Sequence, residues 1–597
     1  MTDTITSERL YQAILHGAAS IRARREDLNR INVFPVIDYD TGNNLAHTMN
    51  YILTHASVHP SVRETLREIA RSALMSARGN SGVIFSQYFN GMYLESAEKD
   101  AVTLAELAVY FQEAYNKAYK SLENAVEGTV ITVMRAWAVS FREALSQHKS
   151  PLELFESALA HIRQALEETR YNLRALKTLG LVDAGALGFY YFMEGFVQAL
   201  SGKVSLSLEQ SQDVVLPDVE DDIHRFSEHE TIPFRYCTEV LADCPNLNQD
   251  ALRETLKDRG DCLLIASADT LVRVHLHTNE PWNVVKAVAG QGKVLEQKAD
   301  DMVQQNLLAG VFEERIAIVT DSIADLPQDY IFNHRIFQVP INIVIDEVSF
   351  LDKVTIDHDY LYTHLSRASS AQPNTEQVLA LLQPLLKRFS QVLVLTVSSK
   401  MSGTWSRFRE AIDTLGDDAG RVALIDTKVN SGAEGLLVKK AVELAEAGQP
   451  LDIIVTQLEA LKARAKILVS VLDIEPMARS GRVSERIGNL LIKLQFKPLV
   501  TIKPSGEGSI KGVAFSVKMN NRIFRKSLKR QKMESYVIVH ADGGERVETL
   551  RQDMVRFTGM EPLYITDISS VVTLFAGKGA VAVAYLEKAQ TEEANPS

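Results

Sequence analysis

The first two hundred residues carry apolar side chains at helical spacing. Residues 104–122 (LAELAVYFQEAYNKAYKSL) and 152–173 (LELFESALAHIRQALEETRYNL) repeat apolar positions every three or four residues, which predicts amphipathic helices. Four short glycine-bearing segments interrupt the helical pattern: DYDTGNN, SARGNSG, VEGT and DAGALG. We therefore expect an all-α bundle over residues 1–203 whose loops gather at one end.

The pattern changes twice after this region. Residues 204–229 are acidic and poor in apolar side chains, which indicates a solvated linker. Residues 230–312 combine strand-like runs (CLLIASA and TLVRVHLHT) with helix-like segments that end in glycine, as in a small α/β domain. Residues 313–597 contain buried-looking strand runs, several followed by helix-like segments, which predicts parallel sheets covered by helices; the runs are IAIVTDS, VLVLTVSS, VALIDTK, YVIVHAD and AVAVAYLE.

Composition narrows the class of protein. With 597 residues the chain is too long for one core, and 46% hydrophobic and 23% charged residues are ordinary for globular domains. A net charge of −12 argues against a nucleic-acid binder. The polar start MTDTITSERL and the lack of a long apolar run predict neither a signal peptide nor a transmembrane segment, and three cysteines make no disulfide framework, so we expect a cytoplasmic protein.

The first candidate for chemistry is a pair of carboxylates, Asp38 and Asp40, followed by Thr41 and Gly42. Like charges at this spacing repel unless a cation or solvent intervenes. Magnesium needs only a couple of carboxylates beside phosphate oxygens, which these residues would provide. The alternative is an ordinary polar turn, because the stretch is rich in turn formers.

The other three glycine-bearing segments supply what a phosphate site would need around such an ion. Glycines let the backbone approach phosphate oxygens, and backbone N–H groups can cradle them. Each segment alone is weak evidence, since glycine at helix junctions is common. The candidate residues of these segments are Gly79, Ser81 and Gly82; Gly128 and Thr129; and Asp183 and Gly185.

Taken together and in order, the segments NVFPVIDYDTGNN, ARGNSGVIFSQ, VEGTVITVMRA and LVDAGALGF resemble the nucleotide-binding (DhaL-like) domain of dihydroxyacetone kinases, and more closely that of bacterial fatty acid kinase. The resemblance covers residues 5–203 and implies an antiparallel helix barrel with ATP and Mg²⁺ at one mouth. It implies that Asp38 and Asp40 hold Mg²⁺. It also implies that nucleotide or phosphate is contacted by residues of all four segments, namely Asn32, Thr41, Asn43, Asn44, Ser81, Gly82, Gly128, Thr129, Asp183 and Gly185.

The resemblance has two departures near the metal. The family usually has glycine between the aspartates and a small hydroxyl residue after Gly42, where this chain has Tyr39 and Asn43. Both carboxylates are nevertheless kept, so the expected magnesium site stands.

A second candidate metal site lies in the middle domain. His275 and His277 are one residue apart on a predicted strand, so they share a face, and Cys237 would make a third ligand of the kind that zinc prefers. The alternative is a strand face with histidines and no metal. The segment from Cys237 to His277 resembles the central domain of fatty acid kinase over residues 230–310, where the matching residues bind Zn²⁺. Cys244 and Cys262 are interpreted as small buried hydrophobes.

The last region resembles the DegV family over residues 315–590, through IAIVTDSIADLP, SSAQPNTEQ, VLVLTVSSKMSGTWS, MARSGRVSE and AVAVAYLE in that order. Members of that family bind a long-chain fatty acid between two α/β subdomains. A buried lipid carboxylate needs hydrogen-bond donors. The candidates are Ser369, Ser370, Ser398, Ser399 and Arg482, although such serines are also common helix caps and Arg482 would serve equally in an ion pair.

This region also departs from its family. SSAQP stands where members commonly carry TTSQP, and Phe575 stands where a histidine often bonds the lipid head group. Losing a donor to a buried acceptor costs about 1–3 kcal/mol. Either another group compensates, or the domain no longer holds a free fatty acid.

The favoured hypothesis is a bacterial fusion enzyme that uses ATP and Mg²⁺ to phosphorylate a fatty acid presented by its own DegV-like domain, with a downstream acyltransferase as consumer and a homodimer as one arrangement. The second is a lipid-binding or regulatory protein with a vestigial kinase site, favoured by Tyr39, Asn43 and Phe575. The third is a dihydroxyacetone (glycerone) kinase acting on a small hydroxy-compound. It ranks last because the family holds such substrates on a separate subunit that nothing here resembles.

Overall fold

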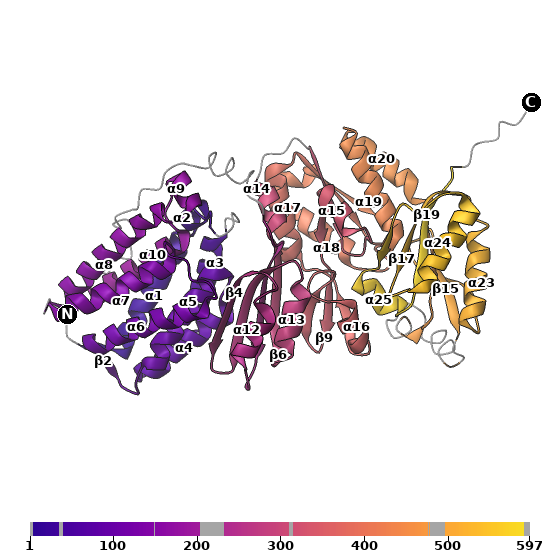
Figure 1. Cartoon of the computed structure of the whole chain (residues 1–597). Coiled ribbons are helices and arrows are strands. Elements are labelled where there is room, and N and C mark those ends of the chain that lie inside the picture. Colours follow the sequence, from indigo (N-terminus) through magenta and orange to yellow (C-terminus); the bar gives the residue numbers. More distant parts are fainter. Residues whose placement is uncertain are drawn as a thin grey trace, which may run out of the picture. The chain divides into compact units, whose positions relative to one another are not determined.

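The computed structural model describes residues 4–34, 40–147, 150–202, 232–309, 315–475, 477, 493 and 496–589. The chain divides into two compact units, Met1–Gly310 and Val311–Ser597. In Figure 1 the first unit runs from indigo to rose and the second from rose to yellow. The acidic segment expected at 204–229 lies outside the described residues.

The first unit begins with a helical bundle, as the apolar spacing predicts. Two short strands, β1 (Thr4–Thr6) and β2 (Ala101–Thr103), pair antiparallel beside it. The helices are α1 (Ser7–Ala23), α2 (Arg25–Arg30), α3 (Thr41–His55), α4 (Val62–Ser76), α5 (Gly79–Glu95), α6 (Leu104–Ser121), α7 (Val130–Ser146), α8 (Pro151–Glu168), α9 (Arg174–Leu179) and α10 (Ala184–Leu200).

Local sequence signals set where several of these helices begin. Thr103 and Glu106 form a reciprocal capping box at the start of α6, and Ser150 and Glu153 do the same for α8. Pro151 occupies the first turn of α8, where its missing N–H costs nothing. The expected helices over 104–122 and 152–173 therefore end within a few residues of the observed ones.

The helix α10 is the buried centre of the bundle. Every residue from Ala184 to Val197 is buried, as expected for a helix that is apolar nearly all round. Its aromatic rings pack edge-on against those of α5, with Phe189 5.2 Å from Tyr88 and Phe192 5.5 Å from Phe89 between centroids. Within the described residues, no helix is both long and apolar enough to cross a membrane.

The middle domain is one antiparallel sheet with helices, in the strand order β4-β5-β3-β6. The central strand β5 is buried at every position from Leu271 to Thr278. The elements are β3 (Tyr236–Asp243), α12 (Gln249–Leu256), β4 (Asp261–Ala268), β5 (Leu271–Thr278), α13 (Pro281–Ala289), β6 (Lys293–Asp301) and α14 (Met302–Ala309).

This sheet shares its hydrophobic core with the helical bundle. Leu264, Ala266 and Leu271 belong to the same buried cluster as the helices' apolar side chains. Polar contacts add to the packing, since Asn90 Nδ2 of α5 donates to the Ser267 carbonyl at 2.6 Å. The helical bundle and the middle domain are therefore held as one body, so side chains from both can build a single site.

The second unit contains two main sheets. A parallel sheet has the order β13-β12-β7-β8, and a six-stranded sheet has the order β16-β15-β14-β19-β17-β18. Its strands are β7 (Ile316–Asp321), β8 (Phe337–Val339), β9 (Asn342–Ile345), β10 (Val348–Leu351), β11 (Ala368–Ala371), β12 (Gln391–Thr396), β13 (Val422–Asp426), β14 (Ala465–Ser470), β15 (Lys497–Ile502), β16 (Gly508–Ala514), β17 (Met533–His540), β18 (Ile565–Asp567) and β19 (Val581–Glu587).

Helices cover both of these sheets, and one helix, α19, packs against both. Gly432 of α19 lies where an added Cβ would stand 2.9 Å from Val537 and 3.1 Å from Ala584. The helices are α15 (Gln328–Asn333), α16 (His358–His364), α17 (Thr375–Arg388), α18 (Thr404–Asp413), α19 (Ser431–Glu446), α20 (Leu451–Lys462), α23 (Val517–Leu528), α24 (Glu545–Thr558) and α25 (Ser570–Ala576).

The expected parallel arrangement is correct for the first sheet and wrong for most of the second. The predicted strand runs 316–321, 391–396 and 422–426 pair parallel. The runs at 533–540 and 581–587 pair antiparallel instead. A buried apolar run does not encode strand direction, which depends here on a hairpin between β15 and β16 and on the short α25 before β19.

Candidate functional site

Four helix N-termini of the bundle meet at one place. A Cβ on Gly79, at the start of α5, would stand 2.5 Å from Asn44 in α3. A Cβ on Gly185, in the first turn of α10, would stand 3.1 Å from Ser81 Oγ and 3.4 Å from Val130, the first residue of α7. The starts of α3, α5, α7 and α10 are therefore neighbours, although they are spread over most of the bundle's sequence.

The candidate residues lie at these helix starts rather than in loops. Three helices have candidates in their first turn: Thr41, Asn43 and Asn44 in α3, Ser81 and Gly82 in α5, and Gly185 in α10. The N-caps of α7 and α10 are Thr129 and Asp183, and Gly128 precedes Thr129. The first N–H groups of a helix have no intrahelical acceptor, and the helix dipole favours an anion there. The arrangement therefore aims several sets of backbone donors at one region.

Two of the glycines have a conformational reason to be there. Gly79 has φ +60° and Gly128 has φ +85°, a backbone region that L side chains rarely adopt. Each also packs closely: a Cβ added to Gly79 would meet Asn44, and one added to Gly128 would meet Asn172. A side chain at either position would force the backbone at the start of that helix to move.

Asp183 holds the start of α10 in place. Its Oδ1 accepts from Ala186 N–H at 2.8 Å, and its own N–H donates to Thr169 Oγ1 at 3.1 Å. Burial raises the pKa of Asp183 to about 6, with hydrogen bonds from Ala186 and Val130 acting in the opposite direction. Its side chain is thus committed to positioning α10 and α7.

The carboxylate pair is described only in part. Asp40 is the residue before α3 and makes no side-chain cap bond to it. Asn32 is buried, and Asn43 N–H donates to Asn29 Oδ1 at 3.0 Å. Asp38, Tyr39 and the rest of 35–39 lie outside the described residues.

The Cys–His candidates of the middle domain are brought together. Cys237 on β3 is paired in register with His277 on β5, and with His275 their ligand atoms lie within 4.8 Å of one another. Both histidines are buried, rather than lying on an exposed strand face. The expected sharing of one strand face by His275 and His277 is confirmed.

The interpretation of Cys262 as a buried hydrophobe is wrong, whereas Cys244 is indeed buried. Cys262 is partly exposed, has φ 57°, and forms a second group of metal-type atoms with Asp261 and His277. The strand β4 has a register shift between Asp261 and Leu264, and Asp261 and Cys262 lie beside His277. Asp261 Oδ1 lies 3.0 Å from His277 Nδ1, so the carboxylate orients the ring.

Three charged residues of this sheet, Glu239, Arg273 and Lys298, are absent from the sequence-based candidates. Glu239 is two residues from Cys237, and Arg273 two residues from His275, so each shares a strand face with a predicted ligand. That alternation was the signal available in the sequence. What the sequence could not show is that this face lies against the bundle.

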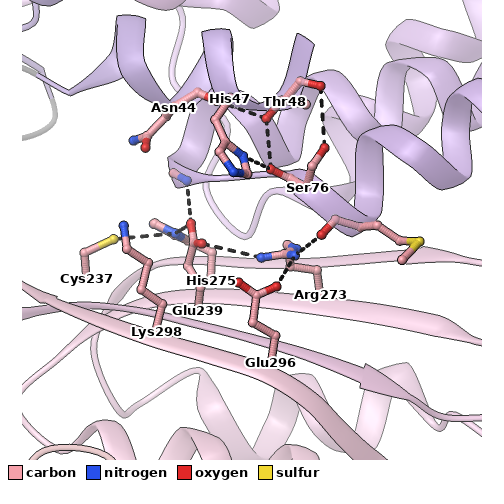
Figure 2. A network of polar contacts seen from close by, with 12 residues as sticks. Asn44, His47, Thr48, Ser76, Cys237, Glu239, Arg273, His275, Glu296 and Lys298 are labelled. Atoms are coloured by element: carbon pink, nitrogen blue, oxygen red, sulfur yellow. Dashed lines mark hydrogen bonds and ion pairs between the residues drawn. The ribbon is translucent and has the colours of Figure 1, made fainter. Parts of the chain in front are cut away.

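Figure 2 shows these side chains between the sheet and the helices. Glu239 is 3% exposed and accepts a hydrogen bond from Gly79 N–H at the start of α5. Arg273 donates to the carbonyls of Leu74 at 2.9 Å and Met75 at 2.6 Å in the last turn of α4. Hydrogen bonds from the sheet therefore hold the junction between α4 and α5, which contains the ARGNSG segment.

The electrostatics of this network are strongly coupled. Burial would raise the pKa of Glu239, but the hydrogen bond to His275 and the charges of Arg273 and Lys298 outweigh it and lower the pKa to about 2. Burial is the largest cause raising the pKa of Cys237, and Glu239, Asp300 and Asp40 add to it.

The donor set of this cluster fits a thiophilic cation. One thiol and two imidazoles are ligands that zinc prefers, and their ligand atoms lie within 4.8 Å of one another. An ion would also offset the negative surroundings that keep the thiol protonated.

The described serine candidates of the second unit lie on two segments that touch, since a Cβ on Gly403 would meet Gln372. Ser369 and Ser370 lie on β11, while Ser398 Oγ donates to the Gly506 carbonyl at 2.8 Å and Ser399 Oγ to Asp426 at 2.5 Å. Arg482 lies outside the described residues. Phe575 is half-buried in α25, so an apolar ring occupies the position where the resemblance implied a histidine.

A buried acidic cluster lies at the carboxyl end of β7. The residues Asp321, Asp325, Asp352 and Glu434 are fully buried, and Lys353 Nζ lies 2.9 Å from Asp325. Backbone and hydroxyl groups donate to the three aspartates, whereas neither carboxylate oxygen of Glu434 has a hydrogen-bond partner among the described residues. No pattern in the sequence indicated this cluster.

Three protein-family models match successive parts of the chain. The DAK2 domain matches residues 35–198, the middle domain of FakA-like fatty acid kinase proteins matches 233–307, and the DegV family model, described as an uncharacterised protein family, matches 315–588. The chain therefore joins three recognised domains in this order.

Curated relatives match over part of the chain. An uncharacterized protein of Staphylococcus haemolyticus is 30% identical over 317 residues, 51% of this chain and 57% of that protein. An uncharacterized protein of Staphylococcus aureus is 30% identical over 313 residues, with the same coverage. The match thus spans little more than half the length of these relatives.

Solved structures resemble the second unit's share of the chain. A fatty acid-binding DegV family protein from Thermus thermophilus is 26% identical and covers 46% of this chain and 99% of its own, with a TM-score of 0.41. DegV of Bacillus subtilis, a fatty acid binding protein, is 22% identical and covers 46% and 100%, also with a TM-score of 0.41.

Proposed function

We propose that this chain, which joins a DAK2 domain, a middle domain of the FakA-like fatty acid kinase type and a DegV-family domain, is an ATP- and Mg²⁺-dependent kinase that phosphorylates a fatty acid carboxylate. The observation that carries the proposal is the convergence of four helix starts beside Asp40. Such a set of backbone donors suits a triphosphate, and a carboxylate at its edge suits the cation that accompanies one.

Each group of residues has a separate task in this proposal. Asp38 and Asp40 hold Mg²⁺, which neutralises phosphate charge when bound. Ser81, Gly82, Thr129 and the N–H groups around them bind phosphate oxygens. Asp183 acts by fixing α10 through its bond to Ala186, not by touching the nucleotide.

The substrate needs little chemical activation. A fatty acid carboxylate is ionised at neutral pH, so its attack on the γ-phosphorus requires no general base. Alignment of the two reactants and neutralisation of charge dominate phosphoryl transfer. The product is an acyl phosphate, with ADP as the leaving group. A site that supplies backbone donors and a cation, but no base, matches these requirements.

The lipid is proposed from the domains rather than from the serines. The middle domain matches a family named for fatty acid kinase, and a DegV-family domain, for which we propose lipid binding, lies on the same chain. Covalent linkage of two such domains would replace bimolecular docking by a high effective concentration. For Cys237, His275 and His277 we propose a Zn²⁺ site.

Turnover with and without lipid tests the proposal. Purified protein is incubated with Mg·ATP and oleate, and acyl phosphate is trapped with hydroxylamine as the hydroxamate. We expect hydroxamate in proportion to ADP, and none from an Asp38→Ala, Asp40→Ala variant. Label from γ-labelled ATP in dihydroxyacetone instead of lipid would contradict the proposed substrate.

A second candidate is a lipid-responsive regulator whose kinase site is vestigial. It is favoured by Asn43, whose N–H is already bonded to Asn29, and by Phe575 in place of a lipid-binding histidine. This candidate predicts lipid binding without turnover. Equal Mg·ATP binding by wild type and the double aspartate variant would favour it over the kinase.

A further inference from the structure

Glu239 of the middle domain accepts a hydrogen bond from the start of α5, which belongs to the proposed nucleotide site. Gly79 N–H, at the start of α5, donates to Glu239 Oε1. The same oxygen lies 3.3 Å from His275 Nδ1, and the other oxygen lies 3.5 Å from Arg273. Because a nucleotide phosphate at α5 would need that N–H, the carboxylate of Glu239 competes with it for the donor.

The same side chain also contacts the Cys–His cluster. His275 Nδ1 is 3.3 Å from Glu239 and 3.8 Å from Cys237 Sγ, so one ring nitrogen faces both. A nitrogen that binds a cation offers its lone pair and cannot at the same time carry the proton that bonds a carboxylate. A cation between Cys237 and His275 at this nitrogen therefore excludes the His275–Glu239 hydrogen bond.

We propose that Glu239 is a switch shared by the two sites: it holds the Gly79 N–H when the Cys–His cluster is empty and releases it to nucleotide phosphate when a thiophilic cation binds. This inference rests on the proposed nucleotide site and adds a regulation of it. Glu239 is a positioning residue here, because it acts through Gly79 and not on the substrate.

The direction of the coupling follows from charge. A cation at the cluster attracts the adjacent Glu239 carboxylate, which at the same moment loses its bond to His275. Removing that negative charge from Gly79 also removes repulsion of an incoming triphosphate. Cation binding should therefore tighten nucleotide binding, and by linkage nucleotide should tighten cation binding by the same factor.

The rest of the network restricts how the loop can respond. Arg273 binds the carbonyls of Leu74 and Met75, and His47 Nδ1 lies 3.0 Å from the Ser76 carbonyl, so the end of α4 is held on two sides (Figure 2). The first residue of α5 then has little freedom to follow Glu239. A movement of Glu239 therefore changes only whether the Gly79 N–H is available to a phosphate oxygen.

The test measures nucleotide affinity, which does not require turnover. The full chain is stripped of metal with a chelator and titrated with a fluorescent ATP analogue in excess Mg²⁺, with and without one equivalent of Co²⁺. We expect Co²⁺ to tighten analogue binding by about tenfold, within the usual range for coupled sites. In Glu239→Gln the metal-free protein should already bind tightly, and Co²⁺ should change its affinity less than twofold.

Glu296→Gln is the matched control. Glu296 lies 3.6 Å from Arg273 and Glu239 lies 3.5 Å from it, but Glu296 contacts neither Gly79 nor His275 among the described residues. Its response to Co²⁺ should equal that of the wild type. The visible absorption of Co²⁺ bound through a thiolate shows that both variants are folded and load the cluster.

The outcomes separate the two claims. If wild type binds the analogue equally with and without Co²⁺, or if Glu239→Gln keeps the full response, the switch is overturned while the nucleotide site stands. If no form binds the analogue, the proposed function falls and the switch falls with it.

Discussion

Glu434 is the buried carboxylate with the least support in the described part of the second unit. It is fully buried on α19, and neither of its oxygens has a hydrogen-bond partner among the described residues. Burial is the main cause that raises its pKa well above the ordinary value of 4.5, and Asp321 and Asp325 add to it. Burial likewise raises the pKa of Asp321 to about 7.

These shifts give the second unit a defined pH dependence. Above pH 4.5 the unfolded chain has released the Glu434 proton while the folded chain retains it, so the folded state binds more protons. Stability contributed by Glu434 is therefore lost as pH rises above 4.5 towards the folded pKa. Asp321 acts with the same sign between its ordinary value of 3.8 and about 7.

Glu434→Gln should remove the part of this pH dependence of stability that comes from Glu434. The amide cannot ionise, so the variant should match the wild type near pH 5 and be more stable than the wild type at pH 8, because only the wild type loses stability as the pH rises. Thermal unfolding at both pH values measures the difference. Glu376→Gln, at an exposed position on α17, is the control, and equal shifts for both variants would contradict the account.

For single residues, the sequence predicted which side chains could be metal ligands better than it predicted which residues they contact. His275 and His277 could be chosen because alternation on a strand fixes a common face, and Cys237 because of its ligand type and the resemblance. Glu239 could not, because its role depends on Gly79, 160 residues away in the sequence. The buried acids around Glu434 were equally hidden, since single carboxylates in a sequence look like solvated surface.

At the scale of elements, the start of α5 is the part of the site with the tightest geometry. Gly79→Ala should weaken Mg·ATP binding, because φ +60° disfavours a side chain and the new Cβ would meet Asn44 Nδ2 at 2.5 Å. A lost hydrogen bond to a charged phosphate costs about 1.5–3 kcal/mol, or tenfold or more in affinity. Titration with Mg·ATP measures this.

Gly180→Ala is the matched control for that substitution. Gly180 has φ +66°, so the backbone strain is comparable, but nothing lies within 4 Å of its Cβ position. It should lower stability without changing nucleotide affinity. Equal losses of affinity in the two variants would show that strain, and not the shape of the α5 start, is responsible.

The contact between β5 and α4 should carry much of the attachment of the middle domain. Arg273→Ala removes two hydrogen bonds to α4 and leaves Glu239 buried beside a lost partner, which costs about 3–5 kcal/mol for a broken buried pair. Urea unfolding followed by Trp137 and Trp282 fluorescence measures the loss.

Arg67→Ala is the control at the same interface. Arg67 also joins the bundle to the sheet, through Asp269 at 3.4 Å, but its side chain is 42% exposed to solvent. Its removal should change stability little. A loss as large as that of Arg273→Ala would contradict the assignment of the attachment to the buried contact.

Element positions were largely predictable, and strand direction was not. Capping residues and apolar spacing marked the helices, and the glycine-bearing segments marked four junctions, each of which leads into the start of a helix. The sequence placed those segments in loops because glycine and asparagine are turn formers. In the structure their N–H groups begin helices, which is what makes them suited to an anion.

At the scale of the whole molecule, the DegV domain is expected to hold lipid weakly. Phe575 stands in α25 where the resemblance implies a histidine, so under the proposed function Phe575→His should raise the amount of fatty acid that copurifies with the full chain. A restored donor to a buried carboxylate is worth about 1–3 kcal/mol. Mass spectrometry of extracted lipid measures occupancy and chain type together.

Phe515→His serves as the control, since Phe515 is 71% exposed and a donor there should bind nothing. Unchanged lipid content in both variants would contradict a carboxylate near Phe575. Increased content in both would indicate nonspecific binding by histidine.

Calorimetry with adenine nucleotide addresses the central claim, that the gathered helix starts and the acidic pair form a cation-dependent triphosphate site. Wild type titrated with ADP or ATP in Mg²⁺ should show one saturable site per chain, and the heat should vanish in EDTA and in the Asp38→Ala, Asp40→Ala variant. Heat that persists without Mg²⁺, or none under any condition, would contradict the claim.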